Sequence, residues 1–270
     1  MERVGNAEYK LVVKNLLMYI DSLCLENDIK YFVFYGTLLG TIRHSGFIPW
    51  DDDVDICMPR EDYERFKKLF PRDNGRYRVI NTDNCDLYPS CFSKVYDESV
   101  LIKIKHNFNY TCGAFIDVFP LDKVPEDVDI DALYDVMTKK TEMIVNYSMP
   151  VKSYLNLKPW KRLKFICNLP NYIRFHKNSR MYITDREKFM TQFNDISTKQ
   201  YVDFSDSIGR IRLDDFDKLE RHKFEDIEVN VPCGYVNILT ALYGDYMKLP
   251  KEEERKTTHS FIAYKNRKYR

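Results

Sequence analysis

Apolar residues recur along the chain with two different spacings, and the spacing predicts which segments are helices and which are strands. Apolar side chains three and four positions apart indicate amphipathic helices, and short apolar runs bounded by turn-forming residues indicate buried strands. The expected helices are residues 8–26, 37–44 and 60–70 and a helix that ends near residue 147. The expected strands are residues 31–35, 51–58, 77–82, 92–97, 99–105 and 113–119, the last stopped by Pro120. This order predicts an α+β fold with a mixed β-sheet flanked by helices.

The character of the sequence changes near residue 125, which predicts three parts. Residues 1–125 are expected to form the core, 126–230 a mainly helical subdomain, and 231–270 a C-terminal helical segment that packs back on the core. Residues 158–188 hold nine Lys or Arg against two acidic residues, a local charge of +7. A solvated helix face is the ordinary interpretation of such a run. The sharper interpretation is a patch for an anionic substrate or a membrane surface.

Composition excludes several classes of protein. The 270 residues are 44% hydrophobic and 31% charged, a globular balance that excludes disorder. Lys and Arg total 42 against 41 acidic residues, so bulk basic charge for nucleic-acid binding is absent and no nucleic-acid partner is expected. No apolar run approaches the ~18 residues that a bilayer span needs. The seven cysteines include no CxxC pair, which favours reduced thiols and a cytoplasmic location.

The acidic run DDDVD at 51–55 is the most informative stretch of the sequence. Side chains of a strand alternate between its faces, so Asp53 and Asp55 are expected on one face and Val54 on the other. Adjacent carboxylates repel each other unless a cation lies between them, and hard oxygen ligands suit Mg²⁺ or Mn²⁺. The alternative is a solvated turn, which the apolar flanks of the run disfavour.

Gly36 and Thr37 form a predicted strand-to-helix turn just before this acidic run. Free N–H groups at a helix N-terminus bind phosphate. A phosphate site beside a metal-binding carboxylate pair is the minimal equipment for phosphoryl transfer.

A third carboxylate, Asp117, lies within the apolar segment FIDVF. A buried Asp needs a partner, because an isolated charge there costs several kcal/mol. Asp117 is therefore expected on a neighbouring strand, either to bind a second metal ion or to take the proton of an attacking hydroxyl. The alternative is a structural Asp that caps a turn. Asp122, which follows Pro120, is expected to be more exposed.

Three further polar residues are weaker candidates for substrate binding. Arg43 closes the helix after the phosphate turn and can reach phosphate, or it simply complements the helix dipole. Lys94 either faces the site from a strand or is an ordinary exposed strand lysine. His259 is a candidate contributor from the C-terminal segment, with a structural role as the alternative.

Three segments resemble the LicD family of phosphotransferases. FYGTLLGTIRHSGFIPWDDDVDICMPREDYERF (34–66) resembles its first block, GAFIDVFPLDKVPED (113–127) its second, and VPCGYVNILTALYGDYMKLPKEEER (231–255) its closing block. The resemblance implies a nucleotidyltransferase fold, with 1–125 as its catalytic core. It leaves about residues 140–225 uncovered, and the helical subdomain 126–230 is separately expected to admit the acceptor. The resemblance assigns Gly36 and Thr37 to phosphate, and Asp53, Asp55 and Asp117 to metal and catalysis. Asp51 lies in the same block and is a further contact candidate.

The resemblance also implies an activity. The family transfers phosphocholine from CDP-choline to cell-surface glycans, and relatives such as fukutin-related protein use CDP-ribitol. The expected reaction is attack on the distal phosphorus of a CDP-alcohol, with CMP leaving and Mg²⁺ or Mn²⁺ as cofactor. The acceptor would be a glycan or glycolipid of lipopolysaccharide, teichoic acid or capsule. The basic stretch of the middle region separately predicts peripheral contact with an anionic glycolipid at the inner membrane face.

Two other functions remain open at this point. One is nucleotidyl transfer from a nucleoside triphosphate to a small molecule or a protein. The other is a non-catalytic binding or regulatory protein on the same fold, which is disfavoured because Asp53, Asp55 and Asp117 are all present.

Overall fold

The computed structural model describes residues 2–70, 75–104, 112–155, 158–205, 210–256 and 261–269. The helices are α1 (Asn6–Glu26), α2 (Tyr35–His44), α3 (Arg60–Leu69), α4 (Ile130–Ser148), α5 (Val151–Leu155), α6 (Pro159–Cys167), α7 (Leu169–Thr191), α8 (Leu213–Phe216) and α9 (Tyr235–Tyr243). The strands are β1 (Phe32–Val33), β2 (Asp55–Pro59), β3 (Tyr77–Ile80), β4 (Ser93–Ile104), β5 (Cys112–Lys123), β6 (Gln200–Val202), β7 (Ile211–Arg212), β8 (Leu219–Phe224), β9 (Ile227–Pro232) and β10 (Phe261–Lys265).

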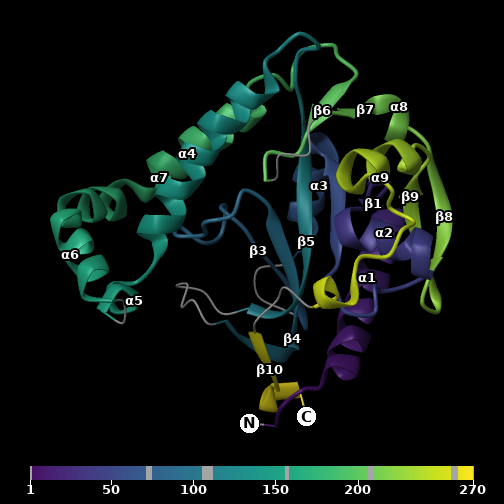
Figure 1. Cartoon of the computed structure of the whole chain (residues 1–270), viewed down its shortest axis with the longest axis horizontal. Helices are drawn as coiled ribbons and strands as arrows, with labels where there is room; N and C mark the ends of the chain where they lie inside the picture. The colour runs from purple at the N-terminus through teal and green to yellow at the C-terminus, as the bar shows by residue number, and fades with distance from the viewer. Residues whose placement is uncertain are drawn as a thin grey trace.

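A curled mixed sheet forms the centre of the molecule, with helices around it (Figure 1). Its main path runs β1-β2-β5-β4-β10, with β3 added beside β4 and β6 and β7 added beyond β5. Strands β2 and β5 are parallel, whereas β4 is antiparallel to both β5 and β10. The predicted α+β class, a mixed sheet flanked by helices, is confirmed.

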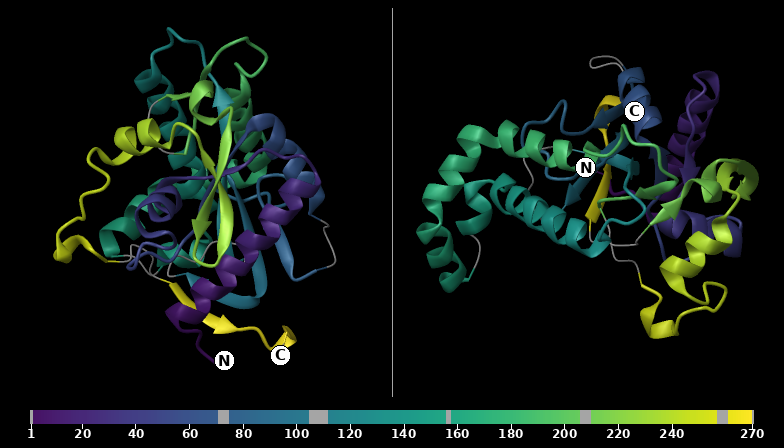
Figure 2. Two further views of the ribbon diagram at one scale, coloured as in Figure 1. Left: turned by 90° about the vertical axis from the view of Figure 1, so that its right-hand side faces the viewer. Right: turned by 90° about the horizontal axis from the view of Figure 1, so that it is seen from above.

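Helix α1 contributes one face of the hydrophobic core. Its side chains Val13, Leu16, Leu17 and Ile20 are fully buried, as the helical spacing of apolar residues in 8–26 predicted. The helix crosses the sheet and contacts β4 and β5 (Figure 2). Apolar burial of this kind is the main force that fixes the sheet and the helix together.

Helices α4–α7 (residues 130–191) form what we call the helical arm. Helices α4 and α7 lie side by side, and α5 and α6 close the far end of the pair (Figures 1 and 2). Asp129 caps α4, its side chain accepting a hydrogen bond from the Ala132 N–H. The end of the predicted helix near residue 147 agrees with Ser148. No helix in the described residues has the length and apolar composition that a membrane crossing requires.

Strand β5 continues through Pro120, where the sequence predicted a stop. The Asp117 N–H donates to the carbonyl of Val54, the residue just before β2, and N–H groups alternate between the two neighbours of a strand. The nitrogen of Pro120 therefore faces the β4 side. Strand β4 begins at Ser93, opposite Val118, so the N–H that Pro120 lacks has no ladder partner to lose.

The prediction that Asp122 is exposed is wrong, and the cause is again that β5 continues past Pro120. Because β5 runs on, the Asp122 carboxylate is fully buried. Arg60 of α3 binds both of its oxygens, at 2.8 and 2.6 Å. The Asn194 side chain donates a further hydrogen bond to it at 2.6 Å.

Two other departures concern strands of the main sheet. The predicted strands 92–97 and 99–105 are one strand, β4, with a register shift between Asp97 and Leu101. In the C-terminal segment, β10 pairs with β4, where the sequence analysis expected helical structure only. Strands β6–β8 and most of β9 lie in the later part of 126–230. The three predicted domain boundaries stay a prediction.

Candidate active site

Three charged residues form a row across three adjacent strands. Asp55 of β2 is in register with Asp117 of β5, and Asp117 is in register with Lys94 of β4. Residues paired in this way present their side chains on the same face of a sheet. The Lys94 ammonium lies 2.5 and 2.8 Å from the two oxygens of Asp117. The row therefore brings together three of the residues singled out in the sequence.

Lys94 is not an ordinary exposed strand lysine, and its role in the site stays a prediction. Its side chain is nearly buried, and its ammonium lies 3.8 Å from the centre of the Phe115 ring. A cation over an aromatic face is stabilised by the ring quadrupole. Phe115 and Asp117 together fix the position of the Lys94 ammonium at the end of the row.

The N-terminus of α2 meets the first residue of β2. The Asp55 N–H donates to Thr37 Oγ1 at 2.8 Å, and the Phe34 N–H donates to the Asp55 carbonyl at 2.9 Å. Thr37 is buried, so its hydroxyl positions Asp55. The contact of Thr37 with phosphate stays a prediction.

Tyr35, at the start of α2, is held in a left-handed conformation with φ of 43°. Such backbone is unfavourable for a non-glycine residue and persists only where its surroundings fix it. The Tyr35 hydroxyl donates to Asp203 at 2.6 Å, which ties the turn to the segment after β6. Tyr35 lies in the first LicD-like segment, but the local sequence pattern predicted no role for it and did not mark Asp203.

The acidic run precedes β2, because the strand begins at Asp55 and not at residue 51. Residues 51–54 belong to no strand, and a turn contact forms at their start: the Asp51 N–H donates to the Ile48 carbonyl. Lys10 of α1 donates to the carbonyls of Ile48 and Pro49 at 3.4 and 3.3 Å. Strand alternation therefore does not place Asp53. Lys10 is a contact that the sequence analysis missed.

Gly36 and Asp51 are in direct proximity. A Cβ atom at Gly36 would lie 3.0 Å from Asp51 Oδ2. The absence of a side chain thus lets this carboxylate approach the N-terminus of α2, where backbone N–H groups carry partial positive charge.

Asp53, Asp55 and Asp117 interact electrostatically despite the different start of β2. Burial raises the pKa of Asp55 well above its ordinary value, and the charges of Asp53 and Asp117 raise it further. The charge of Lys94 lowers the pKa of Asp55, and the charge of Asp51 raises it. Negative charge therefore exceeds positive charge around Asp55.

This excess tests whether the residues suit a divalent cation. Carboxylate oxygens are the donors that Mg²⁺ and Mn²⁺ prefer, and a cation would relieve the repulsion at Asp55. The residues suit such a cation in the type of donor atom and in charge, but not in a finished geometry. Within the described residues, no three His, Cys, Asp or Glu side chains are already arranged as metal ligands. Both oxygens of Asp117 contact Lys94.

A pocket of about 590 Å³ opens beside Gly36 and Asp51. The chain lines it from α2 and the acidic loop on one side, and from the last residue of α9 and the segment after it on the other. The lining side chains are Leu39, Arg43, Ile48, Trp50, Tyr243, Asp245, Tyr246, Lys248, Leu249, Pro250, Lys251 and Glu254, together with Gly36 and Asp51. The segment resembling the closing LicD block thus folds over the turn that carries Gly36.

Arg43 lies in this pocket, but its guanidinium is engaged by the chain itself. Its Nη1 donates to the Tyr246 carbonyl at 2.8 Å, and its Nε donates to His44 Nε2 at 3.0 Å. Arg43 therefore holds the closing segment against α2. Its contact with phosphate stays a prediction, and His259 lies outside the described residues.

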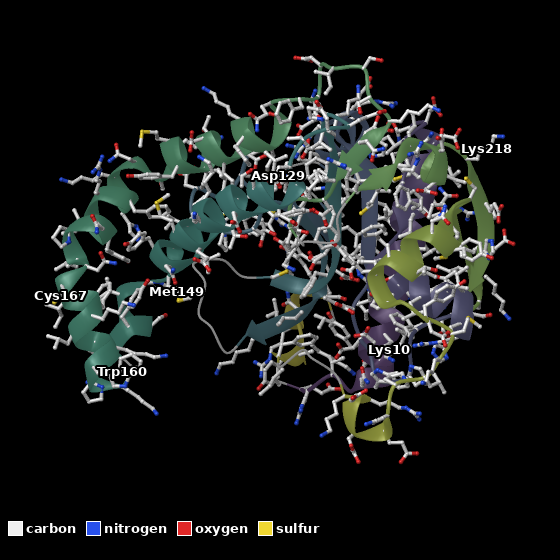
Figure 3. All side chains as sticks on the ribbon, turned by 45° about the horizontal axis from the view of Figure 1, so that its top comes forward. Lys10, Asp129, Met149, Trp160, Cys167 and Lys218 are labelled. Atoms are coloured by element: carbon white, nitrogen blue, oxygen red, sulfur yellow. The ribbon has the colours of Figure 1, made fainter. Side chains whose placement is uncertain are left out.

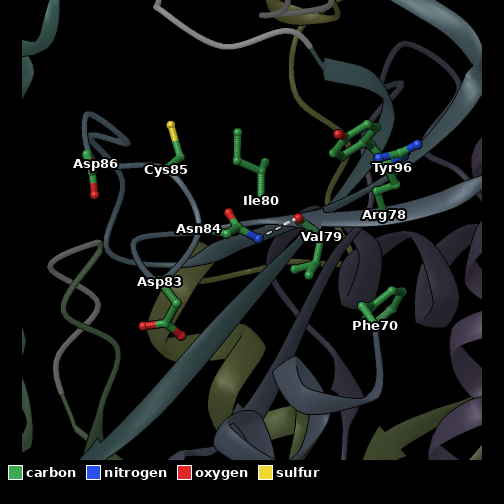
Figure 4. Close-up of a pocket in the computed structure, with 9 residues that line it drawn as sticks. All are labelled: Phe70, Arg78, Val79, Ile80, Asp83, Asn84, Cys85, Asp86 and Tyr96. Atoms are coloured by element: carbon green, nitrogen blue, oxygen red, sulfur yellow. Dashed lines mark hydrogen bonds between the residues drawn. The ribbon is translucent and has the colours of Figure 1, made fainter. Parts of the chain in front are cut away.

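No local sequence pattern marked the aromatic residues of the pocket. Trp50 stands before the acidic run, whereas Tyr243 and Tyr246 are about two hundred positions away. Only the three-dimensional fold brings them together. A separate pocket of about 540 Å³ lies beside β3 and the loop after it, where the Asn84 side chain donates to the Val79 carbonyl (Figure 4). It shares no residue with the candidate site.

The comparisons with known proteins identify the chain as a transferase. The chain belongs to the family described as LicD/FKTN/FKRP, nucleotidyltransferase domain, whose model matches residues 28–171. The resemblance found in the sequence is thereby confirmed.

Particular relatives extend this finding. The chain is 31% identical over 278 aligned positions to the lipopolysaccharide cholinephosphotransferase LicD of Haemophilus influenzae, covering 98% of this chain and 99% of that protein. It is 32% identical to an uncharacterized protein of Rickettsia prowazekii over 43% of this chain and 41% of that protein. The first similarity includes the closing segment that lines the pocket.

Proposed function

We propose that the protein transfers phosphocholine from CDP-choline to a hydroxyl group of a cell-surface glycan and releases CMP. The observation that carries the proposal is the near full-length similarity to a lipopolysaccharide cholinephosphotransferase. The row of Asp55, Asp117 and Lys94 supports the proposal, because the Asp55 N–H donates to Thr37, the residue after Gly36 of the pocket lining.

A divalent cation would be held by Asp53 and Asp55, with Asp117 as a third ligand or as a neighbour. When bound, it would neutralise charge on the donor diphosphate. The backbone N–H groups of Gly36 and Thr37 at the N-terminus of α2 would bind diphosphate oxygens. Gly36 suits this role because it admits a ligand close to the backbone.

The acceptor hydroxyl would attack the distal phosphorus of the donor in line with the leaving CMP oxygen. A new O–P bond forms, the P–O bond to CMP breaks, and the hydroxyl proton passes to a base. Asp117 is our candidate base. Lys94 fixes the direction of its carboxylate from the side of β4, and a general base needs this kind of defined position.

The pocket offers a place for the choline group. Quaternary ammonium groups bind to aromatic faces, and Trp50, Tyr243 and Tyr246 line this pocket. Trp50 already takes a cation contact, since the Arg255 guanidinium lies 5.6 Å from its ring centre. Asp51 and Glu254 add negative charge to the same walls.

Incubation with labelled donors tests the proposal. We expect label from choline-labelled CDP-choline in a glycan product, and no label from nucleoside triphosphates. Asp53→Ala should lower kcat by at least about a hundredfold, because electrostatic stabilisation of the transferred group is usually the largest catalytic contribution. Asp86→Ala, on an exposed side chain, is the matched control.

Transfer of a nucleotide instead of choline would support the nucleotidyltransferase alternative. Failure of all donors to react with wild-type protein, alongside donor binding, would support a non-catalytic binding protein. Activity of Asp53→Ala equal to wild type would contradict the assignment of Asp53.

We further propose that the acceptor is a glycolipid and that the reaction takes place at the cytoplasmic face of the inner membrane. The support is chemical. The acceptor named for the Haemophilus relative is lipopolysaccharide, whose lipid part resides in a membrane.

A further inference from the structure

Helix α6, at the far end of the helical arm, exposes large apolar side chains. All of α6 lies in the described part of the chain, and none of its residues is buried. Trp160, Leu163 and Ile166 are 61%, 63% and 62% exposed. A cluster of exposed apolar residues on one element marks an interaction surface.

These side chains form a stripe with basic edges. At roughly 3.6 residues per turn, Trp160, Leu163 and Ile166 cover about a third of the helix circumference. Arg162 and Lys164 fall on the two borders of the stripe. The opposite side faces the arm, where Phe165 stacks on Tyr154 with ring centres 4.0 Å apart. The exposed stripe is therefore additional to the face that packs α6 onto the protein.

The surrounding sequence is strongly basic. Between Glu142 and Asp185 it holds eight Lys or Arg residues and no acidic residue. The basic run 158–188 is not one uniform patch, however. Arg186, near its end, is fully buried and donates to the carbonyls of Pro89 and Ser90. Four exposed basic residues of the run, Lys158, Lys161, Arg162 and Lys164, lie in or just before α6.

The position of α6 leaves its stripe accessible. Trp160 and Cys167 lie at the outer end of the arm, whereas Asp129 lies where the arm leaves the sheet (Figure 3). A recess of about 590 Å³ lies between α4, α5 and α6, lined in part by Lys139, Lys161 and Lys164. Basic side chains thus also line a space next to the stripe.

We propose that α6 binds the surface of an anionic lipid membrane, with Trp160, Leu163 and Ile166 inserted at the boundary between head groups and acyl chains. Helices with an apolar face bordered by Lys and Arg lie in the interface plane in this way. Anionic head groups attract the basic residues. Membrane binding by α6 does not depend on the reaction proposed for the catalytic site.

The basic residues that border the stripe favour an anionic membrane as its binding partner over a second copy of the chain. In a symmetric dimer through α6, identical surfaces would face each other. Arg162 and Lys164 of one copy would then approach those of the other, and like charges repel at such an interface. Anionic lipid supplies the complementary charge.

Co-sedimentation of the full chain with vesicles tests the proposal. We expect binding to phosphatidylcholine vesicles that contain phosphatidylglycerol, and much weaker binding to phosphatidylcholine alone. The double variant Leu163→Glu with Ile166→Glu, and the triple charge reversal at Lys161, Arg162 and Lys164, should each weaken binding by at least about tenfold. Added salt should weaken wild-type binding as well.

Leu25→Glu on α1 is the matched control, because Leu25 is also 63% exposed but lies away from the arm. It should bind vesicles like the wild type, and circular dichroism should show all variants folded. Equal binding of wild type to neutral and anionic vesicles, or unchanged binding of the α6 variants, would overturn the proposal. So would self-association in solution that the same α6 variants abolish.

Activity separates this proposal from that for the catalytic site. With a water-soluble acceptor, the α6 variants should keep wild-type turnover. With an acceptor embedded in anionic vesicles, they should lose turnover. Loss with both acceptors would assign α6 a role in the fold or in catalysis and would overturn membrane binding as its function.

Discussion

At the scale of single residues, the site depends on a few polar contacts that hold charge in place. Thr37 illustrates this. Its hydroxyl accepts the Asp55 N–H, so one side chain joins the start of α2 to the start of β2. A buried N–H that lost this acceptor would be destabilising by about 1–3 kcal/mol. Residues at this turn therefore act by position as well as by direct contact with substrate.

Asp55 gives a prediction about pH. Burial and the charges of Asp53 and Asp117 raise its pKa in the folded protein. As pH rises from the ordinary value of about 4, the unfolded chain releases this proton before the folded chain does. The free energy of unfolding should therefore fall through that window and stay level above the raised pKa. The variant Asp55→Asn should lack this fall.

Chemical denaturation of metal-free protein across a pH series measures the difference between wild type and Asp55→Asn. Asp86→Asn, at an exposed site, should follow wild type. Mg²⁺ should raise the stability of wild type at high pH and leave Asp55→Asn nearly unchanged. Parallel pH curves for wild type and Asp55→Asn would contradict the electrostatic account.

At the scale of elements, strand pairing decides where the site residues meet. The register of β2, β5 and β4 aligns Asp55, Asp117 and Lys94. A shift of one residue in the pairing register would turn a strand's side chains to the other face of the sheet. The three side chains of the row would then no longer lie together. The irregularity of β4 between Asp97 and Leu101 lies further along the same pairing.

Gly113, opposite this irregularity, gives a prediction about the β4–β5 pair. A Cβ at this position would lie 2.0 Å from the Asp97 carbonyl oxygen and 2.8 Å from that of Val100. These are backbone atoms, so Gly113→Ala should lower the free energy of unfolding by about 3 kcal/mol through forced shifts of the strand. Thermal and chemical denaturation measure the loss.

Gly5→Ala is the control for Gly113→Ala, because a Cβ there meets nothing within 4 Å. Its loss should be about 1 kcal/mol or less, the ordinary effect of alanine at a helix N-cap. Equal losses for the two variants would show that the strand tolerates a side chain at Gly113.

At the scale of the whole molecule, a buried ion-pair network joins the sheet to the helical arm. Arg60 at the start of α3 binds Asp122 of β5 and lies 3.8 Å from Glu187 of α7. Asn194, just beyond α7, donates to Asp122 as well. The network therefore connects three elements that carry the core and the base of the arm.

Removal of Arg60 tests this network. Arg60→Leu leaves the Asp122 carboxylate buried without its cation, and should lower the free energy of unfolding by about 3–5 kcal/mol. The double variant Arg60→Leu with Asp122→Leu should recover a large part of that loss, because the Asp122 charge that Arg60 compensates is then absent as well. Denaturation measures stability, and limited proteolysis of the arm measures its attachment. A double variant no more stable than Arg60→Leu would contradict this explanation.

Local patterns predicted much of the molecule correctly. The apolar periodicity of 8–26 located α1, and the alternation of apolar runs and turns indicated a mixed sheet with helices around it. The acidic run and the apolar setting of Asp117 identified the carboxylates that interact around Asp55. These features depend on neighbours in the sequence, which periodicity and residue chemistry report directly.

Other features depended on contacts between distant segments. Pro120 was expected to end a strand, but which neighbour its nitrogen faces is a property of the assembled sheet. Asp122 was expected to be exposed, yet Arg60 from α3 makes its burial possible. The pairing of Lys94 with Asp117 likewise follows from the register of two strands.

The sequence by itself determined the family, the class of fold and the residue types that can carry phosphoryl transfer. Tertiary structure alone decided that residues after α9 close a pocket over Gly36 and that α6 exposes its apolar stripe at the end of an arm. The physical reason is that spacing along a chain encodes periodicity and local charge. Which surfaces become buried against each other depends on the packing of the whole chain.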